Sequence, residues 1–201
     1  MKKILIVGGT GTIGKEIVNA LKPNNEVIIA GQKHGDIQVD ITQKESIEQL
    51  YQAVGKVDAV VSAAGKVRFA AFDKMNDELY RFGLNDKLMG QVNLVLLGLA
   101  HLNDAGSFTL TSGILNRDPI VTGSSAAMVN AALDAFVKAA AIELPRGVRI
   151  NIVSPTVITE ALDKYAAYFP GYESVSAARA AQAYVKSVMG AQTGQLYVVG
   201  N

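Results

Sequence analysis

The sequence contains no cysteine, and it has only two histidines, His34 and His101, among its 201 residues. Without thiol groups the chain can form no disulfide, no cysteine nucleophile and no thiolate metal site. The two histidines lie far apart in the sequence, so they do not favour a histidine-based metal centre either. We therefore expect no metal site.

Charge and long apolar runs are also scarce. Charged residues make up 18% of the chain, and the net charge is +1 with no basic tail or stripe, which disfavours nucleic-acid binding. The apolar stretch 92–100 is shorter than the ~18 residues that a membrane span requires. The apolar run 4–7 is shorter than that of a secretory signal. We expect a cytoplasmic protein with neither a nucleic-acid nor a membrane partner.

Apolar residues are plentiful, at 49% of the chain, and they form short Val- and Ile-rich runs that alternate with helical stretches. This alternation predicts βαβ units and a parallel sheet covered on both faces. No linker or repeat interrupts it, so we expect one domain over residues 1–201, with seven mostly parallel strands in a doubly wound, three-layer α/β fold. Strands are expected near 3–7, 26–30, 36–40, 59–62, 107–111, 148–153 and 195–199, and helices near 12–21, 42–54, 73–82, 86–102, 124–144 and 174–189.

Two local features of the sequence bear on where the strands and helices begin and end. Only about five residues, 31–35, separate the second and third expected strands, whereas a parallel crossover normally takes a dozen or more. Either the third strand is very short or its pairing is irregular. Thr42, with Glu45 three residues later, has the spacing of a capping box and predicts that a helix opens there.

A glycine-rich turn follows the first expected strand, with glycines at positions 8, 11 and 14. Such glycines permit a tight turn, a close backbone approach to a pyrophosphate, and packing of the next helix against the strand. The N-terminus of that helix offers free N–H groups to phosphates. This context predicts a Rossmann-type dinucleotide site, although a turn without a ligand is the alternative. The residues expected to contact the cofactor here are Gly8, Thr10, Gly11, Thr12, Ile13 and Gly14.

The residues after the second expected strand bear on the choice between NAD and NADP. An NAD site has an acidic residue there, which binds the ribose hydroxyl. This chain has Gln32 and Lys33 instead, and a lysine can bind the 2′-phosphate of NADP. We therefore expect NADP(H) rather than NAD(H), with Gln32 and Lys33 as contacts. The alternative is that Lys33 is an ordinary solvated lysine.

Taken together, these segments resemble the short-chain dehydrogenase/reductase family over essentially the full chain. Four further stretches carry the resemblance: 40–42, similar to the family's adenine-contacting acidic dipeptide; 62–65, similar to its N-N-A-G segment; 110–112, where the family keeps its catalytic serine; and 151–159, similar to its nicotinamide-binding segment. The resemblance implies further cofactor contacts by Asp40, Ile41, Ala63, Ala64, Gly65, Pro155, Thr156, Val157 and Thr159.

The family's proton relay is missing from this sequence. Its members use a tyrosine as acid and base and a lysine four residues later, on the helix after the serine strand. Here the matching positions are Ala126 and Asn130, and neither side chain can transfer a proton at neutral pH. Any proton donor must therefore be non-standard.

Several other residues are candidates for that chemistry. Ser112 matches the family's serine, which polarises the substrate carbonyl, and Asn85 resembles its helix asparagine, which supports a relay water. Tyr165 and Tyr168 lie in the segment that forms a lid in the family, with Lys164 beside them. Their alternative role is packing. Lys66 and Arg68 could polarise a carbonyl or bind an anion, or they could be solvated loop residues.

The sequence thus leaves two functions open. The first is an NADP(H)-dependent oxidoreductase that moves a hydride to or from a small carbonyl or alcohol substrate. The second is a catalytically inactive NADP(H) sensor or partner-binding protein on the same fold. The apolar stretches 88–102 and 126–141 resemble the family's subunit interface and imply a homodimer or homotetramer.

Overall fold

The computed structural model describes residues 1–200 and contains one seven-stranded, fully parallel sheet with the strand order β3-β2-β1-β4-β5-β6-β7. This order reverses direction at β1, as in a doubly wound Rossmann fold, and it confirms the predicted fold class. The strands are β1 (Lys3–Val7), β2 (Glu26–Gly31), β3 (Ile37–Gln38), β4 (Val57–Ser62), β5 (Leu102–Thr111), β6 (Arg149–Pro155) and β7 (Leu196–Val199).

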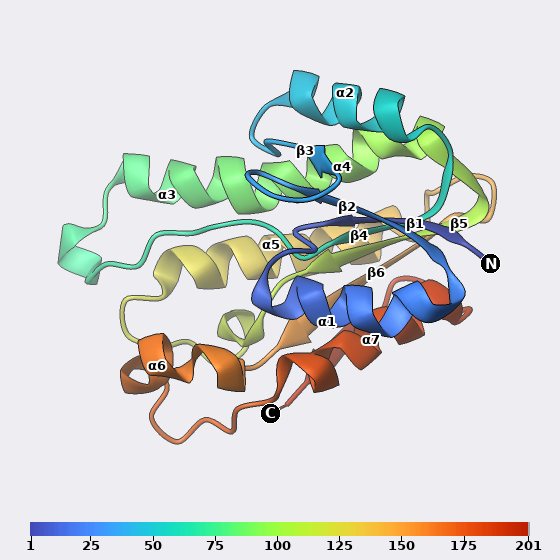
Figure 1. Ribbon diagram of the computed structural model, residues 1–201. Coiled ribbons are helices and arrows are strands. Elements are labelled where there is room, and N and C mark those ends of the chain that lie inside the picture. The colour runs from blue at the N-terminus through green and yellow to red at the C-terminus, as the bar shows by residue number, and fades with distance from the viewer. Residues whose placement is uncertain (201) are drawn as a thin grey trace.

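Helices cover both faces of the sheet (Figure 1). The main helices are α1 (Thr12–Leu21), α2 (Lys44–Val54), α3 (Asp77–Gly83), α4 (Gly90–Gly98), α5 (Ser124–Ala140), α6 (Leu162–Tyr165) and α7 (Ala177–Met189). Between α3 and α4 lies a π-helical segment, Leu84–Met89, so that these three form one continuous helical rod. Within residues 1–200, no helix has the length and apolar character needed to cross a membrane.

The hydrophobic core is divided by the sheet into two layers. On β1, Leu5 and Val7 pack into the layer beneath α2, α4 and α5, whereas Ile4 and Ile6 pack into the layer beneath α1 and α7. This is the period-two alternation of a strand that is buried on both faces. The apolar runs of the sequence therefore serve both layers at once.

The short connection between β2 and β3 is resolved by a very short β3. Only Ile37 and Gln38 pair with β2, in parallel register with Ala30 and Gly31. Asp36 closes the intervening loop, because its carboxylate accepts a hydrogen bond from the backbone N–H of Ile29, 2.8 Å away. The crossover is too short for a helix, and the edge strand is reduced accordingly.

The predicted capping box at Thr42 is wrong. Helix α2 begins at Lys44 with Gln43 as its N-cap, and no side chain caps it. Thr42 instead donates to Asp40, from its backbone N–H at 3.0 Å and from its hydroxyl at 2.7 Å. This local turn satisfies Thr42 outside the helix, in competition with the capping role.

Other element ends also differ from the sequence prediction. Helix α3 starts at Asp77 rather than near residue 73, because the Asn76 side chain caps it by accepting from the N–H of Leu79. Helix α7 starts at Ala177 behind a Ser176 cap. Strand β5 begins five residues earlier than expected, at Leu102, and contains a register shift opposite β4.

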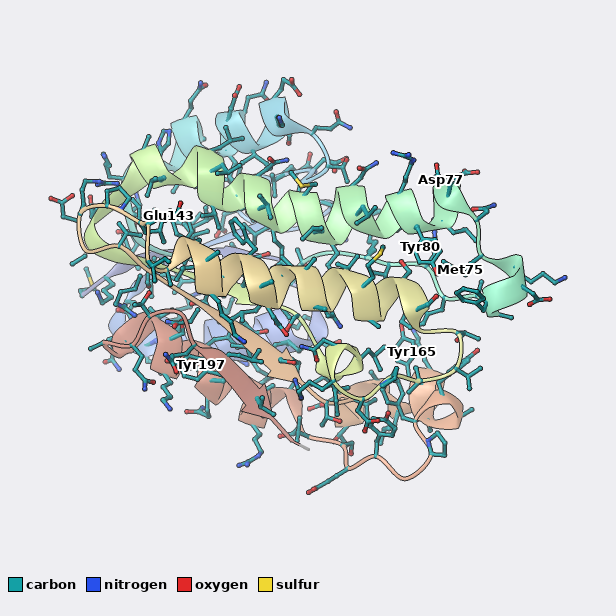
Figure 2. All side chains as sticks on the ribbon, turned by 180° about the vertical axis from the view of Figure 1, so that it is seen from behind. Met75, Asp77, Tyr80, Glu143, Tyr165 and Tyr197 are labelled. Atoms are coloured by element: carbon teal, nitrogen blue, oxygen red, sulfur yellow. The ribbon has the colours of Figure 1, made fainter. Side chains whose placement is uncertain are left out.

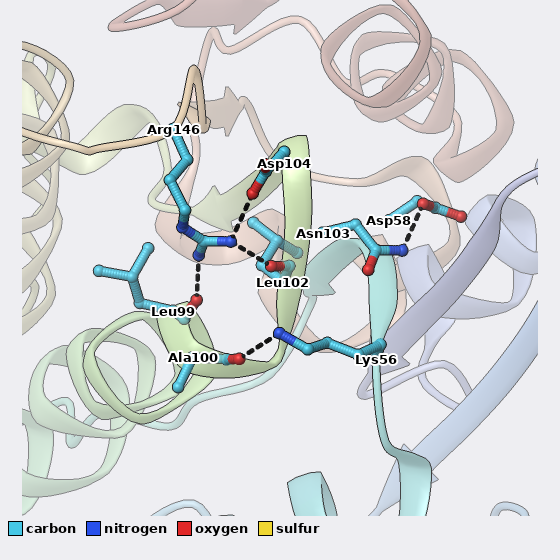
Figure 3. Close-up of polar contacts among 8 residues, drawn as sticks. All are labelled: Lys56, Asp58, Leu99, Ala100, Leu102, Asn103, Asp104 and Arg146. Carbon is cyan, nitrogen blue, oxygen red and sulfur yellow. Dashed lines mark hydrogen bonds and ion pairs between the residues drawn. The ribbon is translucent and has the colours of Figure 1, made fainter.

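The end of the sheet where the strands begin is closed by cations bound to backbone carbonyls (Figure 3). The Arg146 guanidinium donates to the carbonyl oxygens of Leu99 and Leu102, and it pairs with the Asp104 carboxylate. The Lys56 ammonium donates to the carbonyl oxygen of Ala100. These contacts pin the loop that leads into β5.

Candidate active site

The glycine turn lies at the opposite end, where the strands finish. Gly8 has φ +84° and donates its N–H to Ala30, and a Cβ on it would stand 2.6 Å from the carbonyl oxygen of Ala63. A Cβ on Gly14 would stand only 2.0 Å from the carbonyl oxygen of Gly8. Only glycine fits at these two positions, so the turn brings the start of α1 close to the ends of β1 and β4. The first N–H groups of α1 have no intrahelical acceptors and can bind an anion.

A first cavity opens beside this turn, at the ends of β1 and β2. It brings together six of the predicted cofactor contacts, namely Gly8, Gln32, Asp40, Ile41, Ala64 and Gly65. Lys66 also lines it and donates to the side-chain oxygen of Gln32 at 3.0 Å. Lys33 is exposed and does not line this cavity. The cation beside Gln32 is therefore Lys66, which sequence reasoning had treated only as a substrate-side candidate.

Asp40 carries a negative charge in this cavity. The Thr42 hydroxyl and the Thr42 backbone N–H donate to its carboxylate and lower its pKa, against the opposing effect of burial. Ile41 lies against the start of α4, where a Cβ on Gly90 would approach its Cδ1 to 2.8 Å. The acidic dipeptide of the sequence is thus fixed on both sides.

A second cavity, of about 380 Å³, continues from the first along the same edge of the sheet. The two cavities share Ala64 and Gly65 as lining residues. Nine predicted site residues line the second one: Ile13, Ala63, Ala64, Gly65, Ser112, Pro155, Thr156, Val157 and Tyr165. Figure 2 shows Tyr165 at the same end of the molecule as Tyr80, away from Glu143.

Other predicted residues lie outside both cavities. Thr10, Gly11 and Thr12 are exposed on the glycine turn itself. The Thr159 hydroxyl is bonded to Ser174, and Tyr168 lines a neighbouring cavity that it shares with Tyr165. The neighbouring cavity is lined by Phe69, Ile120, Lys164, Tyr165, Tyr168 and Phe169.

Asn85 does not lie in the site. It is exposed on the π-helical segment and lines neither cavity. Two residues later in the same segment, Lys87 reaches the second cavity. Its ammonium donates to the carbonyl oxygen of Ser112 at 3.0 Å and to the side-chain oxygen of Asn130 at 2.7 Å.

Lys87 is a site residue that sequence reasoning missed. Helical spacing alone does not show which face of the rod it occupies, because the π geometry changes the register within Leu84–Met89. The available signal is chemical: it is a lysine directly before the long apolar stretch 88–100. The glycine at position 65 is a second signal in the sequence, because a Cβ there would stand 2.7 Å from the Lys87 Cγ and would collide with the lysine side chain.

The surroundings of Lys87 alter its acidity. Burial disfavours the charged ammonium and lowers the pKa of Lys87 from 10.5 to about 8, with a smaller opposing attraction from Asp134. The amine is therefore protonated at neutral pH, yet much closer to its titration point than a surface lysine.

The segments that surround the two cavities suit a dinucleotide. The glycine turn leaves no space for Cβ atoms, the helix N-terminus can hold the phosphates, and the cavities meet at Ala64 and Gly65. The Thr156 hydroxyl is buried, has no hydrogen-bond partner within residues 1–200, and lies among the lining residues of the second cavity. The residues present thus fit an extended, phosphate-containing ligand.

Comparison with known proteins assigns this chain to a family. A family model described as enoyl-(acyl carrier protein) reductase matches residues 14–195. The chain belongs to the short-chain dehydrogenase/reductase family. An uncharacterized oxidoreductase of Methylorubrum extorquens is 26% identical over 184 residues, which cover 79% of this chain and 74% of that protein.

Solved structures agree with the family assignment. The protein lin1944 from Listeria innocua has a TM-score of 0.98 and 52% identity, with 99% of this chain and 100% of that chain covered. A small-chain dehydrogenase in complex with NADPH has a TM-score of 0.88 and 25% identity, with 100% and 97% covered. The sequence-based family resemblance is therefore confirmed.

Ala126 and Asn130, the two positions at which the sequence resemblance predicts that the family's proton relay is missing, both line the second cavity. Asn130 also donates to the carbonyl oxygen of Gly113 at 3.2 Å. These two positions thus contribute no ionisable side chain to the cavity.

Ser112, the expected carbonyl-polarising residue, has its hydroxyl turned away from solvent. Its Oγ is fully buried and makes no well-aligned hydrogen bond, yet it lies near enough to the Asp134 carboxylate to affect its acidity. Burial raises the pKa of Asp134, and the Ser112 hydroxyl, Asn116 and Arg117 partly offset that rise. In this structure Ser112 contributes its backbone carbonyl, which binds Lys87, more directly than its hydroxyl.

Proposed function

We propose that this protein is an NADP(H)-dependent oxidoreductase that transfers a hydride to or from a small carbonyl or alcohol substrate. The observation that carries the proposal is the continuous pair of cavities, which runs from the glycine turn to the cavity of about 380 Å³. That volume lies within the range of small-molecule sites. Support also comes from the NADPH complex of a family member that is 25% identical to this chain.

In the proposed complex the N-terminus of α1 binds the pyrophosphate, and the first cavity holds the adenosine. No acid stands at positions 32–34 directly after β2, and Gln32 with the Lys66 ammonium offers donors to a 2′-phosphate, with Lys33 on the same loop. This arrangement favours NADP(H) over NAD(H). The bound nicotinamide supplies or accepts the hydride, while the protein orients the reactants and excludes water.

The walls of the second cavity support a mostly apolar substrate. Its substrate side is lined by Val67, Phe69, Ile114, Leu115 and Phe169. Apolar walls with few polar groups bind a small ligand by burial and fix its orientation at the polar groups. A small apolar aldehyde, ketone or enone fits this description.

The first test is the melting temperature of the purified protein alone, with saturating NADPH, and with saturating NADH. A ligand at a hundred times its dissociation constant adds about 2.7 kcal/mol of stability, which shifts the melting temperature by a few degrees. We expect a shift with NADPH and a smaller one with NADH. The absence of any shift would refute the cofactor site.

Turnover is tested separately, by oxidation of NADPH in the presence of benzaldehyde, cyclohexanone or cyclohexenone. We expect NADPH to be consumed with at least one of these probes. Binding without any turnover would favour the second candidate, a catalytically inactive NADP(H) sensor or partner-binding protein. The observation behind that candidate is the replacement of both relay residues, at Ala126 and Asn130, beside intact cofactor segments.

We also propose that the protein assembles as a homodimer or homotetramer through α4 and α5. Leu96 is 61% exposed on α4, at an apolar groove between the two helices. The groove residues are Val95, Leu96, Leu99, Phe136, Ala139, Ala140, Glu143, Leu144 and Pro145. Sedimentation should give a mass above one chain, and Leu96→Glu should lower it, because a charge would then be buried in the interface.

A further inference from the structure

Lys87 is the one charged residue among the described residues that line the cavity of about 380 Å³. It comes from the π-helical segment, and no ion pair holds it within residues 1–200. Its two partners, the Ser112 carbonyl and the Asn130 side-chain oxygen, are both neutral acceptors. The cavity therefore contains an ammonium whose charge is not neutralised by direct contact.

The geometry leaves one proton of this ammonium available. A lysine ammonium has three N–H donors, and two of them are used at 3.0 and 2.7 Å. The third has no protein acceptor among the described residues, although Lys87 lines the cavity. Two fixed donors and one free donor define an oriented proton source rather than a mobile surface charge.

The place of this ammonium matters as much as its orientation. Asn130 stands where family members have their lysine, and the Lys87 ammonium is hydrogen-bonded to it. Position 130 itself carries no cation, and the neighbouring helical rod places the Lys87 ammonium beside it. Close packing maintains it, since Gly65 leaves space for the Lys87 side chain.

Resting on the proposed function, we propose that Lys87 is the catalytic acid and base of this protein. In the reductive direction, the carbonyl carbon of the substrate accepts a hydride from the reduced nicotinamide, which is oxidised. The electron pair of the carbonyl π bond moves to oxygen, and that oxygen takes the free proton of Lys87. Lys87 is left as a neutral amine and regains a proton from solvent; alcohol oxidation runs the same steps backward.

The acidity of Lys87 suits this role. A pKa of about 8, lowered by burial, lies near physiological pH, where a general acid or base works best. The charged groups around it are Asp134 on α5, with Arg117 nearby, and Asp86 and Lys66 at the first cavity. Of these, Asp134 acts on Lys87 by attraction and raises its pKa slightly against the effect of burial.

Tyr165 is the competing donor in the same cavity. It lies on the four-residue helix α6 and is 42% exposed, and no described residue forms a hydrogen bond that fixes its hydroxyl. Lys87 is held by two hydrogen bonds on a continuous helical rod. Preorganised geometry favours Lys87, because catalysis depends on the reacting groups being held in position.

The test compares Lys87→Met, Lys87→Arg and Tyr165→Phe with Lys56→Met, a lysine at the far end of the sheet that also binds a backbone carbonyl. We expect Lys87→Met to lower kcat of NADPH oxidation with a carbonyl probe by about 100-fold or more. Lys87→Arg should lose a similar factor, because a guanidinium retains its proton. The NADPH-induced shift in melting temperature should persist in both, and Lys56→Met should match the wild type.

The pH profile gives a second readout. Reduction requires the protonated amine, so kcat of the wild type should fall as pH rises through about 8, whereas alcohol oxidation should increase there. Because the chain has no cysteine, Lys87→Cys can be alkylated at one site with bromoethylamine, which rebuilds a lysine-like amine. We expect the modified protein, verified by mass, to regain activity that the unmodified variant lacks.

Each contrary result has a distinct meaning. Loss of the NADPH shift in both Lys87 variants would overturn the acid role in favour of cofactor binding. Wild-type activity in Lys87→Met, or a loss confined to Tyr165→Phe, would overturn the assignment and leave the proposed function standing. A wild type that binds NADPH but turns over none of the probes would overturn the proposed function, and the role of Lys87 with it.

Discussion

The two ends of the sheet use the same kind of contact for different purposes. Where the strands begin, Arg146 and Lys56 donate to backbone carbonyls, and these contacts close the loop between α4 and β5 (Figure 3). Where the strands finish, Lys87 also donates to a backbone carbonyl, that of Ser112. It does so from the wall of a cavity, with a donor left over.

The difference shows how solvent exposure and contact partners determine what a cation contributes in each setting. Arg146 has an acidic partner, Asp104, and is open to water, so its charged form is stabilised in the folded state. Lys87 has only neutral partners, so burial makes its proton easier to release. The cations where the strands begin stabilise the fold. Where the strands finish, burial destabilises the charged form of Lys87 and makes its proton more reactive.

The largest contrast is expected between two glycines, one at each end. Gly14→Ala should cost about 3 kcal/mol or more of unfolding free energy and abolish the NADPH shift, because its Cβ would meet the Gly8 carbonyl at 2.0 Å. Gly55→Ala has open space, so only the backbone conformation of Gly55 (φ +73°, ψ −144°) opposes it, which should cost about 1–3 kcal/mol and leave the NADPH shift in place. Urea unfolding measures both, and equal losses would show that the glycine turn is not tightly packed.

The next effect is the pH dependence of stability at Lys87. Its folded pKa of about 8 lies below the usual 10.5, so the unfolded chain binds more protons between these values. The stability of the wild type relative to Lys87→Met should therefore rise with pH across this window, by on the order of 2–3 kcal/mol. Urea unfolding at pH 7 to 10.5 measures it. A flat difference would show that Lys87 is well solvated.

At the other end, Arg146→Ala should lower the unfolding free energy by about 2 kcal/mol, because two carbonyl oxygens lose a charged donor. Asp104→Asn is the matched control and should cost less than about 0.5 kcal/mol, since an exposed ion pair contributes little. The NADPH shift should be unchanged in both. A loss of NADPH binding in Arg146→Ala would mean that the two ends are coupled.

The smallest effect is expected for Lys56→Met. Its ammonium is exposed and makes a single contact with the Ala100 carbonyl, so the unfolding free energy should fall by less than about 1 kcal/mol. Urea unfolding measures this loss as well. A loss as large as that of Arg146→Ala would show that the contact with Ala100 is not a minor one.

The fold could be predicted from the sequence because its signals are local. Apolar runs that alternate with helices gave the parallel sheet, and the glycines at 8 and 14 marked a turn that no other residue fits. The start of α2 was mispredicted because Thr42 bonds to Asp40, a local competitor that spacing does not reveal.

Many of the predicted cofactor residues line the two cavities, as their places after strand ends led us to expect, whereas Lys87 was not foreseen. Strand ends are clearly marked in the sequence. Lys87 depends on a π-helical segment, and the side-chain direction there does not follow the α-helical period that sequence analysis assumes. Asn85 and Lys87, two residues apart, face different directions in this segment, so that Asn85 is exposed and Lys87 lines the cavity.

The π-helical segment has an evolutionary consequence. A π turn holds one more residue than an α turn, so a single inserted or deleted codon can create or remove it. The flanking helices α3 and α4 would keep their packing through such an event. A lineage could thus gain or lose an amine at this cavity in one genetic step, without any change on α5.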